Sequence, residues 1–151
     1  MPTRPGEDPL LGHLAVGLDS NVFIYLFETS GVEAAQAGRA LDAINTASIR
    51  VAVSAVAIAE VLTGPARAAD RALMERYLDE IRSLERLTIV PVDSDVAFAA
   101  AMLRGRDKVQ MSDAINLAAT RMSGATAFIT NDRRLRSSTG LEIVPLAAFG
   151  A

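Results

Sequence analysis

Residues 14–26 of the chain read LAVGLDSNVFIYL. The first five residues form a short apolar run, which is typical of a strand that is covered on both faces of a sheet. The run ends at Asp19, and residues 21–28 then have the pattern of a short helix. A buried strand that ends at a carboxylate and leads into a helix indicates the first unit of an α/β fold.

The same alternation of apolar runs and helical patterns continues along the chain. Ser54 and Ser112 each stand where a helix is expected to begin and are predicted to cap it, and the Gly64-Pro65 pair is predicted to end the helix that follows Ser54. Strands separated by helices pair in parallel, so the sequence predicts a single-domain, three-layer α/β/α fold with a mainly parallel sheet of about five strands. The further strands are expected at 49–53, 87–92, 127–130 and 141–144, and the further helices at 32–46, 55–64, 67–84, 93–104 and 113–122.

The length and composition are those of one folded domain. The chain has 151 residues, of which 50% are hydrophobic and 22% are charged, so it can bury a core without disulfides or a structural metal. We expect residues 14–151 to form this domain. Residues 1–13, which are rich in proline and glycine near the start, are expected to form a flexible tail, with His13 at its surface.

The composition also excludes several classes of site. The chain has no cysteine and one histidine, which excludes thiolate metal sites and zinc sites with several histidines. The net charge is −3, so any contact with nucleic acid must use a local basic patch. There is no apolar run long enough to span a membrane and no secretion-signal pattern, and the expected location is therefore the cytoplasm.

Four acidic residues occupy positions where ligands bind in open α/β sheets. Asp19 and Asp132 follow predicted strands, Asp113 opens a helix, and Glu60 lies on the helix after the second strand. Carboxylates gathered at one sheet edge repel one another unless a cation neutralises them. An all-oxygen set suits Mg²⁺, with Mn²⁺ as the other candidate, and no phosphate-binding loop of the GxxxxGK[ST] type is present.

Each acid taken alone also has a purely structural explanation. Asp113 could complement the dipole of its helix, Asp132 could cap a turn, and Glu60 could be a solvated helix residue. Asp19 is the hardest to explain in this way, because it ends a buried apolar run. The joint pattern of four acids is what favours a functional site.

Four segments resemble the ordered motifs of PIN-domain nucleases. They are LDSNVFIYL at 18–26, SAVAIAEVLTG at 54–64, MSDAINLAAT at 111–120 and FITNDRRL at 128–135. Each motif alone is weak, but the four occur in the family's order and at similar spacing. The small size of the chain is similar to that of the VapC-type toxins of bacterial toxin–antitoxin pairs.

The resemblance implies a metal-dependent ribonuclease with a homodimeric state and a small antitoxin partner. Asp19 and Asp113 would hold the principal Mg²⁺, Glu60 would complete that site or position the attacking water, and Asp132 would hold a second ion or tune the first. Asn21 and Thr130 would be supporting polar residues. The products would carry a 5′-phosphate and a 3′-hydroxyl.

Two clusters of basic residues are candidate binding sites for RNA, and one helical surface is a candidate binding site for an antitoxin. The basic clusters flank the third and fourth motifs and could bind RNA phosphates. An antitoxin helix could lie in an apolar groove within residues 30–84, on two amphipathic helices with small residues such as Ala34, Ala35, Ala37 and Ala40. The basic candidates are Arg104, Arg106, Lys108, Arg133, Arg134 and Arg136.

Two other functions remain open from the sequence. One is a non-catalytic PIN-like module that binds RNA or protein. The other is a phosphotransfer domain with Asp19 as the nucleophile, although such enzymes tend to need a nearby lysine, and Lys108 is the only lysine in the chain. Trapping an aspartyl-phosphate on Asp19 would support the second.

Overall fold

The computed structural model describes residues 6–135 and 140–150 and confirms the predicted α/β class. A five-stranded, wholly parallel sheet with the order β3-β2-β1-β4-β5 lies at the centre. All five strands fall on the apolar runs expected from the sequence. They are β1 (Ala15–Leu18), β2 (Arg50–Ser54), β3 (Leu87–Val90), β4 (Ala127–Thr130) and β5 (Glu142–Pro145).

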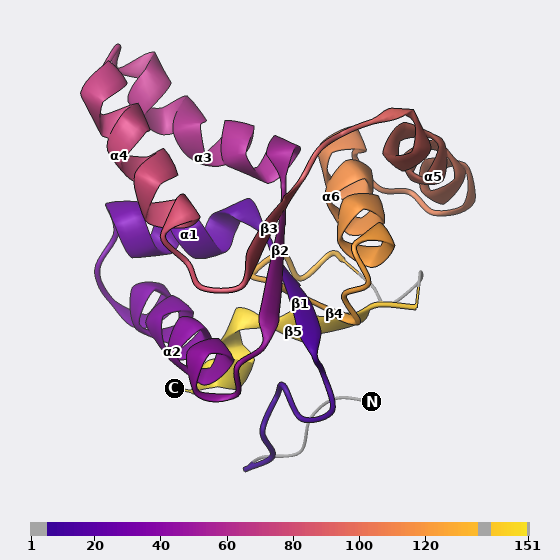
Figure 1. Cartoon of the computed structure of the whole chain (residues 1–151), viewed down its shortest axis with the longest axis horizontal. Helices are drawn as coiled ribbons and strands as arrows, with labels where there is room; N and C mark the ends of the chain where they lie inside the picture. The colour runs from indigo at the N-terminus through magenta and orange to yellow at the C-terminus, as the bar shows by residue number, and fades with distance from the viewer. Residues whose placement is uncertain (1–5, 136–139, 151) are drawn as a thin grey trace.

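Helices cover both faces of this sheet, which gives the expected three layers. In Figure 1, α5 and α6 lie on one side of the sheet, and α1 and α2 lie on the other, with α3 and α4 packed together above them. A short 3₁₀ helix, η1, packs against α2 near the end of the chain. The elements are α1 (Ser20–Glu28), α2 (Val32–Thr46), α3 (Ala55–Arg67), α4 (Arg71–Arg82), α5 (Ser94–Arg106), α6 (Met111–Met122) and η1 (Leu146–Phe149).

Side-chain alternation along the strands produces two hydrophobic cores. Val16, Leu18 and Ile129 point into the core that is closed by the first four helices. Phe128, the neighbour of Ile129 on β4, points into the second core, which is formed with α5 and α6. Because successive side chains of a strand face opposite sides, one short apolar strand supplies both cores. This explains why the strands read as continuous apolar runs.

The central strand also defines where a ligand would bind. The chain leaves β1 for β2 on one side and later returns to β4 on the other side. In an open parallel sheet, such a switch point leaves a crevice at the carboxyl ends of the two central strands. Asp19 directly follows β1 and caps α1, and Asn131 directly follows β4, so both lie at this crevice.

Gly17 allows α6 to pack closely against β1. A Cβ atom at this position would lie 2.6 Å from Oγ1 of Thr120, which is a buried residue of α6. Thr120 is 2% exposed and cannot move away into solvent. The close approach of strand and helix therefore depends on the missing side chain.

We expect Gly17→Ala to lower the free energy of unfolding by about 1–3 kcal/mol, because the extra methyl group overpacks this contact. Urea unfolding followed by circular dichroism would measure it. Gly38→Ala is the matched control, because a Cβ on Gly38 meets nothing within 4 Å. That helical substitution should leave stability unchanged or raise it by about 0.5–1 kcal/mol. Equal stability of the Gly17→Ala variant and the wild type would show that the contact relaxes without cost.

Three predicted helix boundaries are wrong. The helix expected from residue 67 begins only at Arg71, and Arg67 belongs to the preceding helix. The helix after Ser54 does not end at Gly64-Pro65 but continues to Arg67, with Pro65 inside it. Proline removes one backbone donor, but Pro65 lies in the last turn, and its own carbonyl accepts from the backbone N–H of Asp70 at 2.9 Å. This single missing bond is not enough to end the helix.

The third wrong boundary concerns the cap of α6. Gln110, not Ser112, stands at the cap position, without a side-chain hydrogen bond to the helix. The backbone N–H of Ala114 already donates to the carbonyl of Gln110, so the helix starts before Ser112. Ser54, in contrast, caps α3 as predicted, because its hydroxyl accepts from the backbone N–H of Ala57 at 3.0 Å.

The segment before β1 is more closely packed than the flexible tail expected over residues 1–13. Leu10 is 3% exposed and belongs to the first core. His13 is only partly exposed, and its ring nitrogens lie 2.7 Å from Oγ1 of Thr126 and 2.5 Å from a carboxylate oxygen of Glu142. Residues 1–5 lie outside the described part of the chain. None of the helices in the described ranges is both long enough and apolar enough to cross a membrane.

Candidate active site

Asp19 is a buried carboxylate at the junction of β1 and α1. It is 5% exposed and caps α1 by accepting from the backbone N–H of Ser20 at 2.7 Å. The Thr130 hydroxyl donates to its second carboxylate oxygen at 2.7 Å. Burial raises the pKa of Asp19 above its ordinary value, although the hydrogen bonds from Thr130 and Ser20 oppose this shift. The side chain is thus held rigidly where β1 meets the crevice.

Asn21 of α1 and Thr130, the last residue of β4, connect the segments that follow β1 and β4. The Asn21 amide lies 3.4 Å from Asp19 and 3.3 Å from the Thr130 hydroxyl, and its carbonyl oxygen accepts from the backbone N–H of Asn131 at 3.2 Å. The Thr130 hydroxyl also accepts from the backbone N–H of Asp132 at 3.0 Å. These contacts fix the backbone around Asp19 and Asp132, as expected for supporting polar residues.

Glu60 reaches the crevice from α3 and is held by α6. The amide of Asn116 donates to Oε1 of Glu60 at 3.1 Å, and the carbonyl oxygen of the same amide accepts from the hydroxyl of Ser54. Burial raises the pKa of Glu60, while hydrogen bonds from Asn116 and Ser20 lower it and the charge of Asp19 raises it. Asn116 is 2% exposed, so this bridge is part of the buried structure.

The pKa of Asp113 is affected by the charges of the other three acids. Burial, followed by the charges of the other three acids, raises its pKa to about 6. Because charges act strongly on a carboxyl group only at short range, Asp19, Asp132 and Glu60 lie near Asp113. Arg134 partly opposes the shift.

Asp132 differs from the other three acids. Arg134 donates from Nε at 3.0 Å and from Nη2 at 2.8 Å to its two carboxylate oxygens. This bidentate pair holds the pKa of Asp132 below its ordinary value, mainly through the hydrogen bond of Arg134. Asp132 is thus already partly neutralised by a neighbour, whereas no cationic side chain in residues 6–135 and 140–150 is seen to form a hydrogen bond with the other three acids.

The donor set fits a hard divalent cation, although the side chains do not form a closed cage. Among the described residues, no three acidic or histidine side chains converge tightly enough to hold an ion by themselves. All candidate ligands are carboxylate oxygens, and the charges of three of them raise the pKa of the fourth. Mg²⁺ characteristically uses one or two carboxylates and keeps several waters, so an open, strongly acidic site suits it.

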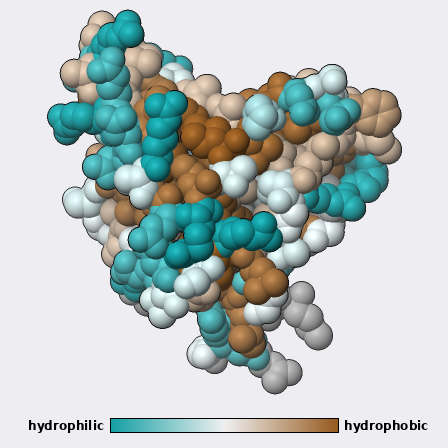
Figure 2. Space-filling view, viewed as in Figure 1, coloured by the Kyte–Doolittle hydropathy of each residue, from teal (hydrophilic) through white to brown (hydrophobic). Residues whose placement is uncertain are grey.

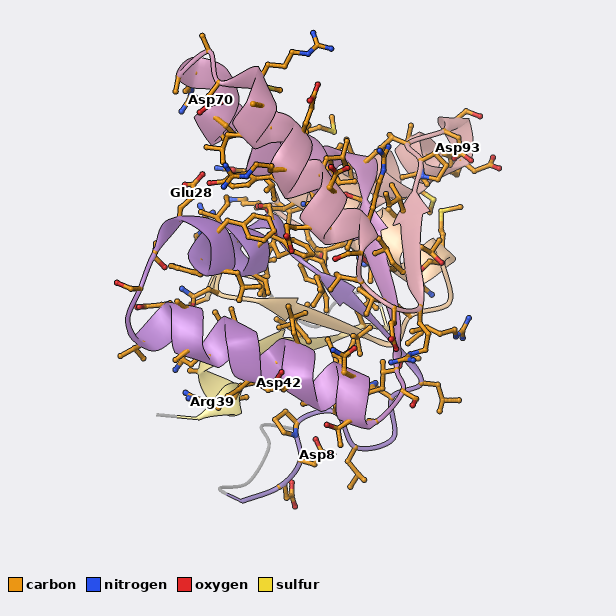
Figure 3. All side chains as sticks on the ribbon, turned by 60° about the vertical axis from the view of Figure 1, so that its left-hand side comes forward. Asp8, Glu28, Arg39, Asp42, Asp70 and Asp93 are labelled. Carbon is orange, nitrogen blue, oxygen red and sulfur yellow. The ribbon has the colours of Figure 1, made fainter. Side chains whose placement is uncertain are left out.

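Other carboxylates of the chain do not share this arrangement. Figure 3 shows Glu28, Asp42, Asp70 and Asp93 on separate elements, spread around the outside of the molecule. Asp70 and Asp93 cap α4 and α5, respectively.

The basic candidates have different roles in the structure. Arg104 donates to the carbonyl of Val109 at 3.2 Å, Arg106 lies 3.6 Å from Asp107, and Arg134 is engaged with Asp132. Lys108 and Arg133 are exposed. Arg136 lies outside the described residues. A pocket of about 390 Å³ opens beside Asp132 and is lined by Arg133 together with Ile143 and Pro145.

Sequence reasoning missed Asn116 and Ser20. Asn116 lies three residues after Asp113, so both side chains lie on the same side of α6. A buried amide on an otherwise apolar helix face was the available signal. Ser20 follows Asp19 directly and contacts both Asp19 and Glu60. The aromatic residue Tyr25 also supports the site, because its hydroxyl accepts from the Asn131 amide at 2.8 Å.

The raised pKa of Asp113 predicts a pH-dependent stability effect in metal-free buffer. The folded state binds this proton more tightly than the unfolded chain, so stability falls as the pH rises from about 4 to about 6 and then stays level. Asp113→Asn removes this loss and should raise the free energy of unfolding above pH 7 by roughly 1 kcal/mol, after allowing for solvent screening at a half-buried site. At pH 4 the variant and wild type should match. Urea unfolding in the presence of a chelator would measure this, and equal stability above pH 7 would contradict it.

Comparison with known proteins identifies a family. A family model described as "PIN domain" matches residues 16–140, while a search of curated proteins gives no significant match. VapBC2 from Rickettsia felis, bound to a promoter DNA fragment, is 17% identical, covers 87% of this chain and 98% of its own, and has a TM-score of 0.69. VapC20 from Mycobacterium tuberculosis, described as a Sarcin-Ricin loop cleaving toxin, is 14% identical (83% and 98% covered, TM-score 0.62). A VapBC-5 toxin–antitoxin structure from the same organism is 25% identical (87% and 98% covered, TM-score 0.56).

Proposed function

Because the chain belongs to the PIN domain family, we propose that it is a divalent-cation-dependent endoribonuclease that acts as the toxin of a toxin–antitoxin pair. The observation that supports this proposal most directly is that Asp19 follows β1 and is bonded to Thr130 of β4, beside the acids whose charges act on Asp113. The solved structures similar to this chain include a toxin described as cleaving the Sarcin-Ricin loop and several VapBC assemblies.

In this proposal, the buried carboxylates bind the cation and prepare the attacking water. Asp19 and Asp113 hold Mg²⁺ or Mn²⁺, and Glu60, which Asn116 holds in place, completes the site or orients the water. Asp132 holds a second ion or tunes the first. The cation supplies Lewis acidity and lowers the pKa of water, so no histidine is needed.

The remaining polar residues position the substrate. The exposed side chains of Lys108 and Arg133 can contact RNA phosphates, and Arg134 stands next to Asp132. Attack of water on phosphorus with departure of the 3′-oxygen leaves a 5′-phosphate and a 3′-hydroxyl. The proposed substrate is RNA, and the proposed protein partners are an antitoxin and a second copy of the chain.

Within the expected range of residues 30–84, α3 and α4 offer a better surface for an antitoxin than the buried small residues of α2. Ala37 and Ala40 are fully buried in the first core, so they offer no groove. A mainly apolar pocket of about 470 Å³ lies instead along α3 and α4, lined by Leu62, Met74 and Leu78. We propose this pocket as the seat of an amphipathic antitoxin helix.

Cleavage of RNA in the presence and absence of Mg²⁺ tests the proposed activity. We expect single-stranded RNA to be cut only with the divalent cation, and end-group analysis should find 5′-phosphates. Cleavage that persists in excess chelator would contradict the proposed chemistry. Intact RNA under all metal conditions would instead favour a non-catalytic binding module. No described contact joins Lys108 to Asp19, so nothing in the structure favours the phosphotransfer alternative.

A further inference from the structure

The pocket of about 390 Å³ beside Asp132 lies at the carboxyl ends of β4 and β5. Thr130 lines this pocket and is also the residue whose hydroxyl donates to Asp19. Asp132, which lines it as well, is one of the acids whose charges act on Asp113. A group bound in this pocket would therefore be next to a phosphate bound at the proposed cation site.

One wall of the pocket is apolar. Ile143 and Pro145 are two residues apart on β5, so their side chains face the same side of the sheet. Pro145 pairs with Thr130, the last residue of β4, and Leu135 adds a buried side chain to the lining. An apolar wall with a few polar groups at its rim is typical of a small-ligand site, and the volume lies within the usual range of about 300–1,000 Å³.

Asn131 and Arg133 supply the polar groups of the pocket. The amide nitrogen of Asn131 donates to Tyr25 at 2.8 Å, and among the described residues no donor bonds to its side-chain carbonyl oxygen. Arg133 is exposed and forms no ion pair within the described ranges, whereas the neighbouring Arg134 is engaged with Asp132. The pocket thus offers one fixed acceptor and one guanidinium that is available to a ligand.

Guanine is the nucleobase whose hydrogen-bonding edges match these two groups. Its O6 and N7 are neighbouring acceptors, and an arginine side chain binds both with two N–H groups. Adenine has one acceptor and one donor on the same edge, and the pyrimidines have no N7. The N1–H of guanine is a donor on the adjacent edge, where the carbonyl oxygen of Asn131 can accept it. The apolar wall suits the flat face of the base.

The approach to this edge of the sheet is open. Figure 1 shows α3 and α4 on one side of the molecule and α5 and α6 on the other, and Figure 2 shows a notch between them with hydrophobic residues at its base. Because β2 leads directly into α3, the carboxyl ends of the parallel strands lie on the side of this notch. A single RNA strand presents its unstacked bases to such a surface, whereas the major-groove base edges of an RNA duplex are out of reach of side chains.

We propose that this pocket binds one unpaired guanine of the RNA substrate, next to the phosphate that is cleaved. Arg133 donates to O6 and N7 of the base, Asn131 accepts from N1–H, and Ile143 contacts the face of the ring. The inference rests on the proposed nuclease function, because it adds a sequence preference to that activity. It gives Arg133 a contact that specifies a base, whereas Lys108 keeps a phosphate contact, which carries no sequence information.

Binding of mononucleotides tests the pocket without any cleavage. In proton–nitrogen NMR spectra of the labelled full chain with a chelator, millimolar guanosine 5′-monophosphate should shift the backbone signals of Asn131, Arg133 and Ile143. Its dissociation constant should be at least about fivefold lower than those of adenosine 5′-monophosphate and of 7-deazaguanosine 5′-monophosphate, which lacks the N7 acceptor. No shift at these residues, or equal affinity for the three nucleotides, would overturn the inference.

Mapping of the cut sites in random-sequence single-stranded RNA with Mg²⁺ tests the preference during cleavage. We expect guanine at one fixed position beside the cut. Arg133→Lys should lower this preference at least about fivefold, because lysine keeps the charge but lacks the planar pair of donors. Ala147→Phe should lower it as well, because Ala147 is exposed and lines the pocket, so that the larger side chain fills it. Ala47→Phe, at the exposed end of α2, is the matched control and should leave the preference unchanged.

The possible results separate the guanine pocket from the nuclease function. Cleavage by the wild type without a guanine preference, or a preference that is unchanged in both pocket variants, would overturn the inference and leave the proposed nuclease function intact. RNA that stays whole with Mg²⁺, while guanosine 5′-monophosphate still binds at Asn131 and Arg133, would contradict the nuclease function and retain the guanine pocket. Circular dichroism would verify that each variant is folded.

Discussion

Replacing Asp19 with asparagine is expected to reduce RNA cleavage by at least about a hundredfold. Loss of a residue that only supports a metal ligand already costs about 10- to 100-fold, and Asp19 is proposed as a ligand itself. Asparagine keeps the shape of the side chain and remains a good helix cap, so α1 should keep its starting point. Initial rates with a defined RNA and saturating Mg²⁺ would measure the effect.

The folding stability of the Asp19→Asn variant shows whether a loss of cleavage is due to lost catalysis or to unfolding. Burial raises the pKa of Asp19, so the charged form is unfavourable in the folded state. The asparagine variant should therefore be at least as stable as wild type in metal-free buffer at neutral pH. Asp42→Asn, which changes an exposed acid of α2, is the matched control and should retain full activity. Full activity of the Asp19→Asn variant would remove Asp19 from the mechanism.

Replacing Asn116 with alanine is expected to reduce cleavage about 10- to 100-fold, although Asn116 is not proposed to touch the substrate. Its amide donates to Glu60 and accepts from Ser54, so the variant releases Glu60 from its fixed position. Loss of the hydrogen bond also removes an interaction that lowers the pKa of Glu60. The acid limb of the pH–rate profile should then move to higher pH.

The Asn116→Asp variant shows whether Asn116 acts by holding Glu60 in place or only by filling space in the core. This variant keeps the volume of the side chain, but an ionised carboxylate cannot donate to Glu60 and adds a like charge beside it. We expect a comparable loss of rate and a comparable shift of the acid limb. Asn45→Ala, on the exposed face of α2, should change neither. An unchanged pH–rate profile in both Asn116 variants would show that Asn116 only fills space.

The strands and the positions of the acids were predictable because both depend on local sequence. The apolar run 14–18 ends at Asp19, and a parallel strand that ends in this way places its next residue at the ligand-binding edge. Thr130 and Asp132 follow β4 in the same manner. The order of neighbouring strands then brings these loops together.

The side chains that form hydrogen bonds and ion pairs with these acids were not predictable, because these contacts depend on distant segments or on the conformation of a turn. The bridge from Ser54 through Asn116 to Glu60 joins β2, α6 and α3, and no spacing in the sequence encodes it. The pairing of Arg134 with Asp132 depends on the turn after β4, where the backbone N–H of Arg134 also donates to Asp132. Burial of Leu10 likewise depends on tertiary packing that a segment rich in proline and glycine does not reveal.

Crystals of the protein soaked in Mn²⁺ would test the central claim, that four acids distant in sequence form one cation site. Anomalous scattering locates manganese without reference to the protein atoms. We expect a peak bounded by the carboxylates of Asp19 and Asp113, close to Glu60, and no peak there in crystals of Asp19→Asn. Well-ordered wild-type crystals at saturating Mn²⁺ without a peak among these residues, or with manganese bound only elsewhere, would contradict the account.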